Sequence, residues 1–331
     1  MAHRESALRV IFFGTPEFAL PSLRLLLSNP NVQIEAIVTQ PDRPRGRGQQ
    51  VSTSAVKDFA LDAGLYVYQP EKIRDESVAA FFRRINPDAV IIIAYGQKIP
   101  QALLDVPRLG WINLHGSLLP KYRGAAPINW AIANGEMRTG VTTMRVDATM
   151  DTGPILLQHE IEIGPDETAP ELSRRMADAG ATLVIDSLFG LDRGEITPRP
   201  QDNSLASHAP LLKKEDGNLD WSLPATQIYN RIRAFDPWPG AYTFFRGQQC
   251  RVWGKPLRRE RLLRDWPAAA VPGSLNFEAD DILALCGEST WLRIKAIQLA
   301  GKKRITAHEF ANGVRLTVHD AFSNDPETPA R

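Results

Sequence analysis

Six consecutive apolar residues, 89–94 (AVIIIA), limit the folds open to this chain more than any other segment. Both faces of such a strand must be buried, as in the centre of a parallel sheet covered by helices on both sides. Other strand-like runs rich in β-branched or aromatic residues occur at 8–13, 33–38 and 110–115. Segments with the apolar spacing of helices lie between them, at 53–65, 77–85 and 126–135. This alternation predicts a doubly wound, mostly parallel α/β domain of the Rossmann-like type.

Two more strand-like runs, at 139–146 and 153–163, precede one long helical stretch at 168–191. The run 153–163 alternates apolar and polar residues, which predicts a strand at an exposed or edge position. Sheets of this class bind ligands at the carboxyl ends of their strands, where the connections diverge. Functional residues are therefore expected just after the strands.

The length of 331 residues is large for one hydrophobic core, so two domains are expected. Residues 1–192 form the predicted α/β domain, and residues 193–212, rich in proline, serine and charge, form a predicted linker. Residues 213–320 hold one helix candidate and then short strand-like pieces split by turn residues. This pattern predicts a small C-terminal β-barrel similar to the oligonucleotide-binding (OB) fold. Residues 321–331 are assigned to a tail without a role.

Composition narrows the class of protein. Lys and Arg number 39 against 38 Asp and Glu, so the net charge of +1 gives no global field for a polyanion, although a local basic patch fits within that balance. The two cysteines, Cys250 and Cys286, have neither metal-ligand spacing nor a disulfide framework, which predicts free thiols in a reducing compartment. The run 89–94 is too short to cross a bilayer and the first ten residues lack an apolar signal core. We therefore expect a cytoplasmic protein and, since no hydrophobic strip marks an interface, a monomer.

Asn113 and His115 stand two apart at the end of the run 110–115, so both side chains point toward one crevice at the carboxyl edge of the sheet. An Asn amide can donate to a developing oxyanion, and a His can transfer a proton near neutral pH. The alternative is that His115 is a satisfied buried polar group and Asn113 forms a turn. Asp151, just before a Thr-Gly turn, is expected to project into the same crevice and to orient the imidazole.

The residues that follow His115 read GSLLP. Gly116 and Ser117 offer free backbone groups in a sharp turn, Leu118 and Leu119 supply an apolar wall, and Pro120 fixes the backbone. An apolar slot beside polar groups suits a flat heteroaromatic cofactor.

These residues carry a resemblance. The run NLHGSLLPKYRGAAPINW (113–130), followed by MDTGPI (150–155), resembles the active-site sequence of the folate-dependent formyltransferases. Four further blocks are similar to the branch of that family that acts on methionyl-tRNA: RVIFFGTPEFA (9–19), TQPDRPRGRGQQ (39–50), IRAFDPWPGAY (232–242) and QLAGKKRITAHEF (298–310). The blocks extend over nearly the whole chain, whereas residues 311–331 match only loosely.

The resemblance implies a one-carbon group transfer that serves translation initiation. The formyl group of 10-formyltetrahydrofolate, the co-substrate, moves to the α-amino group of methionyl initiator tRNA. It also implies that Asn113, His115 and Asp151 are the catalytic residues and that Ser117, Leu118, Leu119 and Pro120 contact the tetrahydrofolate. No metal is expected, because no cluster of His or Cys has ligand spacing.

Basic residues suggest how an RNA acceptor is held. Arg43, Arg45 and Arg47 lie in a Pro- and Gly-rich stretch with one acid, and by the resemblance this arginine loop contacts tRNA. Residues 246–265 carry seven basic side chains and two acidic ones, and a second tRNA-binding group is predicted at Lys302, Lys303 and Arg304. The alternative for each stretch is a solvated surface.

Two other functions remain open from the sequence. A formyltransferase of the same fold that acts on an amino sugar nucleotide or a purine precursor would share Asn113, His115 and Asp151, but it would not need the arginine loop or a basic second domain. A non-catalytic RNA-binding protein would have no use for those three residues beside a folate turn.

Overall fold

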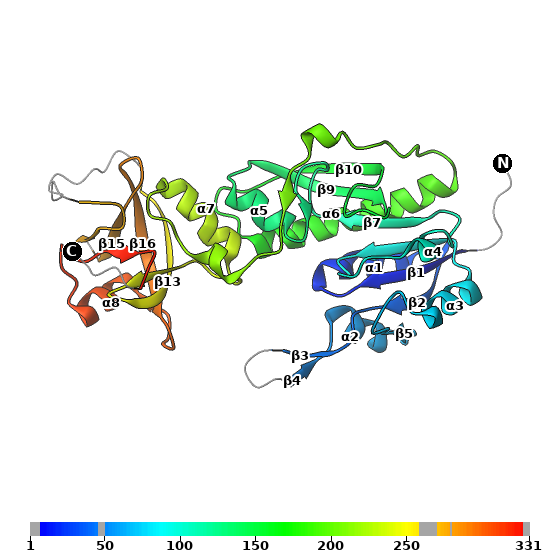
Figure 1. Cartoon of the computed structure of the whole chain (residues 1–331), viewed down its shortest axis with the longest axis horizontal. Coiled ribbons are helices and arrows are strands. Elements are labelled where there is room, and N and C mark those ends of the chain that lie inside the picture. Colours follow the sequence, from blue (N-terminus) through cyan, green and yellow to red (C-terminus); the bar gives the residue numbers. More distant parts are fainter. Residues whose placement is uncertain (1–6, 46–49, 258–269, 279, 327–331) are drawn as a thin grey trace. The chain divides into compact units, whose positions relative to one another are not determined.

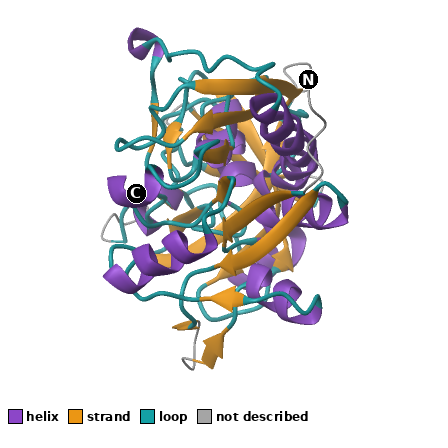
Figure 2. Ribbon diagram, turned by 90° about the vertical axis from the view of Figure 1, so that its right-hand side faces the viewer, coloured by secondary structure: helices purple, strands orange, loops and turns teal. Residues whose placement is uncertain are grey.

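The computed structural model describes residues 7–45, 50–257, 270–278 and 280–326 (Figure 1). The chain divides into two compact units, each of which combines helices with a β-sheet (Figure 2). The first unit consists of Met1–Pro127, Arg138–Ile163 and Glu171–Pro210, and the second of Ile128–Met137, Gly164–Pro170 and Leu211–Arg331. The second unit therefore contains two short segments that interrupt the first unit along the chain.

The sheet of the first unit has seven strands in the order β10-β9-β7-β6-β1-β2-β5. They are β1 (Leu8–Gly14), β2 (Val32–Val38), β5 (Val67–Tyr68), β6 (Ala89–Ile93), β7 (Trp111–His115), β9 (Arg138–Arg145) and β10 (Ile155–Glu162). The pairs among β5, β2, β1, β6 and β7 are parallel, whereas β9 and β10 are added antiparallel. All five residues of β6 are buried at the centre and β10 lies at the edge, so both sequence predictions are confirmed.

Helices cover both faces of this sheet, as the apolar strands require. The helices of the unit are α1 (Leu20–Ser28), α2 (Ala55–Asp62), α3 (Glu76–Ile85), α4 (Gln101–Leu104) and α6 (Ala169–Asp192). On one face Phe13 and Trp111 pack against Phe82 of α3. On the other face α6 lies against β7, where Gly180 is so close to Leu114 that a Cβ at that position would meet the leucine at 2.5 Å. Because side chains alternate along a strand, residues 113 and 115 face away from α6.

Two small strand pairs flank the sheet. The arginine stretch forms the hairpin of β3 (Arg43–Arg45) and β4 (Gln50–Ser52), which follows β2. In the predicted linker, β11 (His208–Ala209) pairs in parallel with β8 (Arg123–Gly124), which follows the turn after His115. Part of the segment 193–212 is thus built into the first unit rather than only connecting two domains.

The second unit is built on an antiparallel sheet in the order β14-β15-β16-β13-β12-β18, with β17 also paired to β16. Its strands are β12 (Tyr242–Phe245), β13 (Gln248–Pro256), β14 (Leu275–Glu278), β15 (Asp281–Cys286), β16 (Thr290–Leu299), β17 (Ile305–Thr306) and β18 (Phe322–Ser323). Its helices include α5 (Pro127–Ala133), which begins at the last residue of the first unit, α7 (Ala225–Phe235) and α8 (Ala307–Val314).

The two ends of this sheet meet. The backbone N–H of Phe322 donates to Gly273 (2.8 Å) and that of Leu275 donates to Asp320 (2.9 Å), so the sheet curls into a small barrel, as predicted. The residues that close it, 320–323, include the beginning of the segment that the sequence assigned to a tail. Their contacts lie far from them in the chain, which is why the local pattern did not reveal them.

Among the described residues, no helix is long and apolar enough to cross a membrane.

Candidate active site

Asn113 and His115 lie at the carboxyl end of β7, between β6 and β9. Asn113 is half-buried, opposite Ile92 on one side and Met144 on the other. Its amide makes no hydrogen bond to any residue that the structure describes. An amide N–H without a partner in the protein can donate to a ligand, so this group is suited to receive a ligand oxygen.

His115 is buried, with a hydrogen bond at one ring nitrogen and a carboxylate facing the other. Its Nε2 donates to the backbone oxygen of Tyr122 (2.9 Å), and its Nδ1 lies 3.7 Å from Oδ2 of Asp151. The side chains of His115 and Asp151 are only 6% and 14% exposed. The first contact places a proton on Nε2, so a second proton would sit on Nδ1, facing the carboxylate. The separation exceeds a hydrogen bond, so the pair interacts electrostatically.

The loop between β9 and β10 presents Asp151 to the site. Its Oδ2 accepts from the N–H of Gly124 (2.8 Å), and its backbone oxygen accepts from Nε2 of Gln201 (2.9 Å). Asp151 has a φ of +54°, a left-handed conformation that a non-glycine residue rarely adopts. Gly153 permits this turn, because a Cβ there would lie 1.8 Å from the backbone oxygen of Arg145. The carboxylate is therefore positioned by several independent contacts.

The turn after His115 is fixed by Thr142 of β9. The Thr142 hydroxyl donates to the backbone oxygen of Ser117 (2.6 Å) and accepts from the N–H of Leu119 (3.1 Å). Nε2 of Gln158 donates both to that hydroxyl and to the backbone oxygen of Leu119. The turn is therefore rigid before any ligand binds.

The four predicted folate-contact residues differ in exposure. The side chains of Ser117 and Leu119 are buried: the Ser117 hydroxyl donates to the backbone oxygen of Lys121 (2.6 Å), and Leu119 packs with Met144. Leu118 and Pro120 are half-exposed. A ligand at this turn can therefore touch the side chains of Leu118 and Pro120, and only the backbone of the other two residues.

The structure adds supporting residues that sequence reasoning missed. They are Thr142, Gln158, Arg123 and Gln201. The buried guanidinium of Arg123 donates to Oε1 of Gln201 (2.7 Å) and to Oδ1 of Asn203 (2.8 Å). Gln201 in turn holds the backbone of the Asp151 loop. Arg123 lies in the KYRG stretch, but its partners are about 80 residues away in the predicted linker, so no local signal identified them.

Polar atoms without partners also lie at the neighbouring strand ends. Tyr95, just after β6, is buried with its hydroxyl unpaired among the described residues, and burial raises the pKa of that hydroxyl to about 12. The Thr15 hydroxyl, just after β1, is likewise buried and unpaired. Both strands end at the carboxyl edge of the sheet, where a ligand of this fold class binds.

The predicted RNA contacts of the arginine loop are described only in part. Arg43 is exposed, Arg45 is seen as backbone in β3, and Arg47 lies outside the described residues. Asp42, just before the hairpin, forms an ion pair with Lys57. The hydrogen bonds from Lys57 and then Gln69 hold the pKa of the Asp42 carboxyl below its ordinary value.

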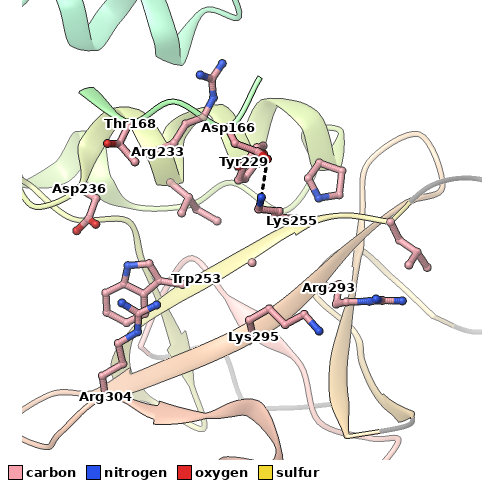
Figure 3. Close-up of a pocket in the computed structure, with 14 residues that line it drawn as sticks. Asp166, Thr168, Tyr229, Arg233, Asp236, Trp253, Lys255, Arg293, Lys295 and Arg304 are labelled. Carbon is pink, nitrogen blue, oxygen red and sulfur yellow. Dashed lines mark hydrogen bonds and ion pairs between the residues drawn. The ribbon is translucent and has the colours of Figure 1, made fainter. Parts of the chain in front are cut away.

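A basic pocket of about 700 Å³ lies within the second unit (Figure 3). It is bordered by α7, by the segment before α6 and by β13 and β16. Its charged and aromatic lining comprises Asp166, Tyr229, Arg233, Asp236, Trp253, Lys255, Arg293, Lys295 and Arg304. Arg304 therefore belongs to this pocket, whereas Lys302 and Lys303 are exposed residues of the turn that precedes it.

The cations of this pocket differ in their partners. Lys255 donates to Asp166 (2.6 Å), and this bond, followed by that from Tyr229, lowers the pKa of the Asp166 carboxyl. Arg293 and Lys295 both lie near Asp281. The Arg304 guanidinium is stacked over the Trp253 ring, 4.0 Å from its centroid, and pairs with no acid within the described part of the chain. Arg233 donates to the backbone oxygens of Gly164 and Glu167 and to Asn230, so Arg304 is the lining cation for which the described residues supply neither an acid nor a hydrogen-bond acceptor.

The cysteines and potential metal ligands offer no further chemistry in the part of the chain described. Cys250 and Cys286 are free and buried, and burial raises the pKa of each thiol to about 12. No group of three or more His, Cys, Asp or Glu residues that could hold a metal occurs among the described residues.

Comparison with known proteins places this site in context. The sequence matches the model of the formyl transferase family over residues 8–188 and the model of the formyl transferase C-terminal domain over residues 211–315. It is 49% identical to the methionyl-tRNA formyltransferase of Solibacter usitatus, over 95% of this chain and 98% of that protein. It is 48% identical to the methionyl-tRNA formyltransferase of Acidobacterium capsulatum, over 93% of this chain and 97% of that protein.

Among solved structures, the chain resembles HypX from Aquifex aeolicus in complex with tetrahydrofolic acid, with a TM-score of 0.60 and 17% identity. The similarity covers 93% of this chain and 48% of that longer protein. At this identity the likeness concerns the fold alone.

Proposed function

The chain belongs to the formyl transferase family, and we propose that it transfers the formyl group of 10-formyltetrahydrofolate to the α-amino group of methionyl initiator tRNA. The product is N-formylmethionyl-tRNA for translation initiation. The observation that carries the chemistry is the free Asn113 amide beside the buried His115–Asp151 pair. The choice of acceptor rests on the relatives, which are similar over almost their whole length.

The three proposed catalytic residues have separate roles. Asn113 donates to the formyl oxygen, where negative charge develops as the amine attacks. His115, charged when Nδ1 carries a proton, stabilises that negative charge and supplies a proton to the leaving nitrogen. Asp151 faces the charged imidazole at 3.7 Å and stabilises it, and a water held by the Asp151 carboxylate takes the proton that the attacking amine loses, which balances the proton given to the leaving nitrogen. The co-substrate supplies a formyl group already attached to a nitrogen, so no covalent enzyme intermediate is required.

The residues around the site fit a folate. Leu118 and Pro120 offer half-exposed apolar surface, and Ser117 and Leu119 offer backbone atoms, in a turn that is already rigid. We therefore keep residues 117–120 as the proposed folate contact.

The tRNA is proposed to contact both units. Arg43, Arg45 and Arg47 would meet it at the first unit, and Lys302, Lys303 and Arg304 at the second, where the stacked Arg304 is left for an anion. A guanidinium on an indole is a surface on which an unstacked base can lie. In this proposal residues 1–192 form the catalytic domain and residues 213–320 the tRNA-binding domain. The protein acts as a cytoplasmic monomer without a metal.

A transfer assay tests the proposal. Labelled 10-formyltetrahydrofolate is offered with methionyl initiator tRNA, methionyl elongator tRNA and a UDP-amino sugar, each in its own reaction. Label on the initiator tRNA alone is the expected result. Label on the sugar would keep the active site and overturn the acceptor, and no transfer to any of the three would overturn the proposed activity.

A further inference from the structure

We propose that three side chains, Gln40, Gln69 and Gln97, couple the arginine hairpin β3–β4 to the loop beside the candidate active site. These three residues, which we call the glutamine relay, follow β2, β5 and β6. They would be positioning residues: they set where the hairpin holds the acceptor relative to the reacting groups. The inference rests on the proposed function, in which the hairpin contacts the tRNA.

The relay holds the chain just before the hairpin. Nε2 of Gln69 donates to the backbone oxygen of Gln40 (2.8 Å) and to Oδ1 of Asp42 (3.0 Å). Lys57 of α2 binds the other carboxylate oxygen of Asp42, which directly precedes Arg43. The backbone that leads into β3 is therefore tied to β5 and α2, and the hairpin cannot turn about its base without breaking these contacts.

The relay also reaches the loop that follows β6. Nε2 of Gln40 donates to the backbone oxygen of Tyr95 (2.7 Å), and its Oε1 accepts from Nε2 of Gln97 (3.2 Å). Oε1 of Gln97 accepts from the N–H of Ile73 (3.1 Å). Gln40 and Gln97 thus use both the donor and the acceptor of their amides, so a carboxylate or an apolar side chain of similar size would lose at least one link.

The Tyr95 loop is packed against the strand that carries Asn113. The Tyr95 ring lies edge-on to Phe13, with ring centroids 4.9 Å apart, and Phe13 contacts Trp111 at 5.0 Å. Trp111 is the first residue of β7 and lies two residues before Asn113. A shift of the hairpin that moves Gln40 would disturb the packing of Tyr95, Phe13 and Trp111, and this aromatic packing includes β7, the strand of Asn113.

This arrangement matters because group transfer between two bound molecules depends on their alignment. A misplacement of about 1 Å can cost roughly a hundredfold in rate. The hairpin is a two-stranded ribbon, and such ribbons are only marginally stable by themselves. The relay makes the base of the hairpin rigid by linking it to the loop after β6, the strand that pairs with β7 beside Asn113.

The test uses Gln40→Leu, which keeps the size of the side chain and removes both amide hydrogen bonds. Gln33→Leu is the matched control, since Gln33 is exposed on β2, the strand that Gln40 follows. In the full-length protein, Gln40→Leu should raise the KM for methionyl-tRNA about tenfold, the equivalent of one or two hydrogen bonds, and change the KM for the folate less than about twofold. A purely structural role would lower the Tm and leave the KM for tRNA at the control value, which would overturn the proposal.

A double-mutant cycle with Arg43→Ala tests the coupling itself. If the relay positions the hairpin, Arg43→Ala should raise the KM for tRNA about fivefold in the wild type, the effect of one phosphate contact, and less than about twofold in the Gln40→Leu background. Equal effects in the two backgrounds would show independent residues and overturn the proposal.

A second measurement does not depend on the acceptor. Backbone hydrogen exchange in β4 should be faster in Gln40→Leu than in Gln33→Leu, because the segment before the hairpin loses its two links to the loop after β6. Equal exchange would overturn the relay whatever the substrate is. A wild-type protein that does not formylate methionyl-tRNA, with the difference in exchange present, would overturn the proposed function and leave the relay as an anchor of the hairpin.

Discussion

The two regions proposed to meet the substrates are built in opposite ways. At the candidate active site, His115 and Asp151 are buried, and each is held by backbone and side-chain contacts from distant segments. In the pocket of the second unit, Lys255 is 59% exposed and Arg304 is exposed on a turn. Bond making requires reacting groups at fixed positions, whereas attraction of an RNA backbone requires charge within reach. The first region is therefore expected to be sensitive to changes in geometry and the second to changes in charge and stacking.

Asn113→Ala should have the largest effect on activity of the variants considered, and it tests whether the first region contains reacting groups at fixed positions. If the free amide stabilises developing negative charge, kcat should fall about 10²–10³-fold, while the KM for tRNA changes little. Steady-state kinetics with saturating folate measure this. The variant removes a group without a hydrogen bond in the protein, so unfolding should not account for the loss, and an unchanged Tm would verify that. A kcat within about threefold of the wild type would remove Asn113 from the catalytic group.

Asp151→Asn should have a smaller effect on the same step. The substitution removes the charge that faces Nδ1 of His115, so kcat should fall about tenfold to a hundredfold, as for loss of a charged contact. Asp147→Asn is the control, because Asp147 lies in the same loop and holds Thr149 and Thr152. An equal loss in both variants would mean that the loop conformation matters and that the charge of Asp151 does not.

The sequence predicted the shared face of Asn113 and His115 better than it predicted the contacts that hold their surroundings. The spacing of Asn113 and His115 implied a shared face because strand periodicity is local, and the apolar run 89–94 identified the central strand for the same reason. Gln201 carried no signal, because it acts across 50 residues on the backbone of Asp151. Contacts of that separation depend on the tertiary fold, which a local pattern does not contain.

The second region shows the same limit. The sequence showed that this region is rich in basic residues. It did not show that Arg304 stacks on Trp253, because that contact depends on how the turn after β16 returns to β13. The exposure of the turn 117–120, the proposed folate contact, was also not predictable: a run of two leucines does not reveal that Leu119 is buried and Leu118 is partly exposed.

Thr142→Val tests, by its effect on the stability of the protein, how firmly the turn of the first region is held. Its hydroxyl makes three hydrogen bonds in a buried setting, and valine keeps the shape while leaving those partners unsatisfied. The free energy of unfolding should fall by about 1–3 kcal/mol. Denaturant unfolding compared with Thr226→Val, an exposed threonine of α7, measures the difference. A loss no larger than in the control would mean that the turn is held by the remaining packing.

Arg304→Lys should give the smallest effect and tests what the second region recognises. Lysine keeps the positive charge but cannot stack its head group on Trp253 as a planar guanidinium does. If an unstacked base lies on this surface, the KM for tRNA should rise about threefold, from the loss of a weak cation–π and stacking contribution. Lys303→Arg on the same turn is the control and should leave the KM unchanged. A wild-type KM in Arg304→Lys, together with an increase in Arg304→Ala, would mean that charge alone attracts the RNA here. In that case the second region differs from the first even more than we propose, because none of its side chains needs a fixed orientation.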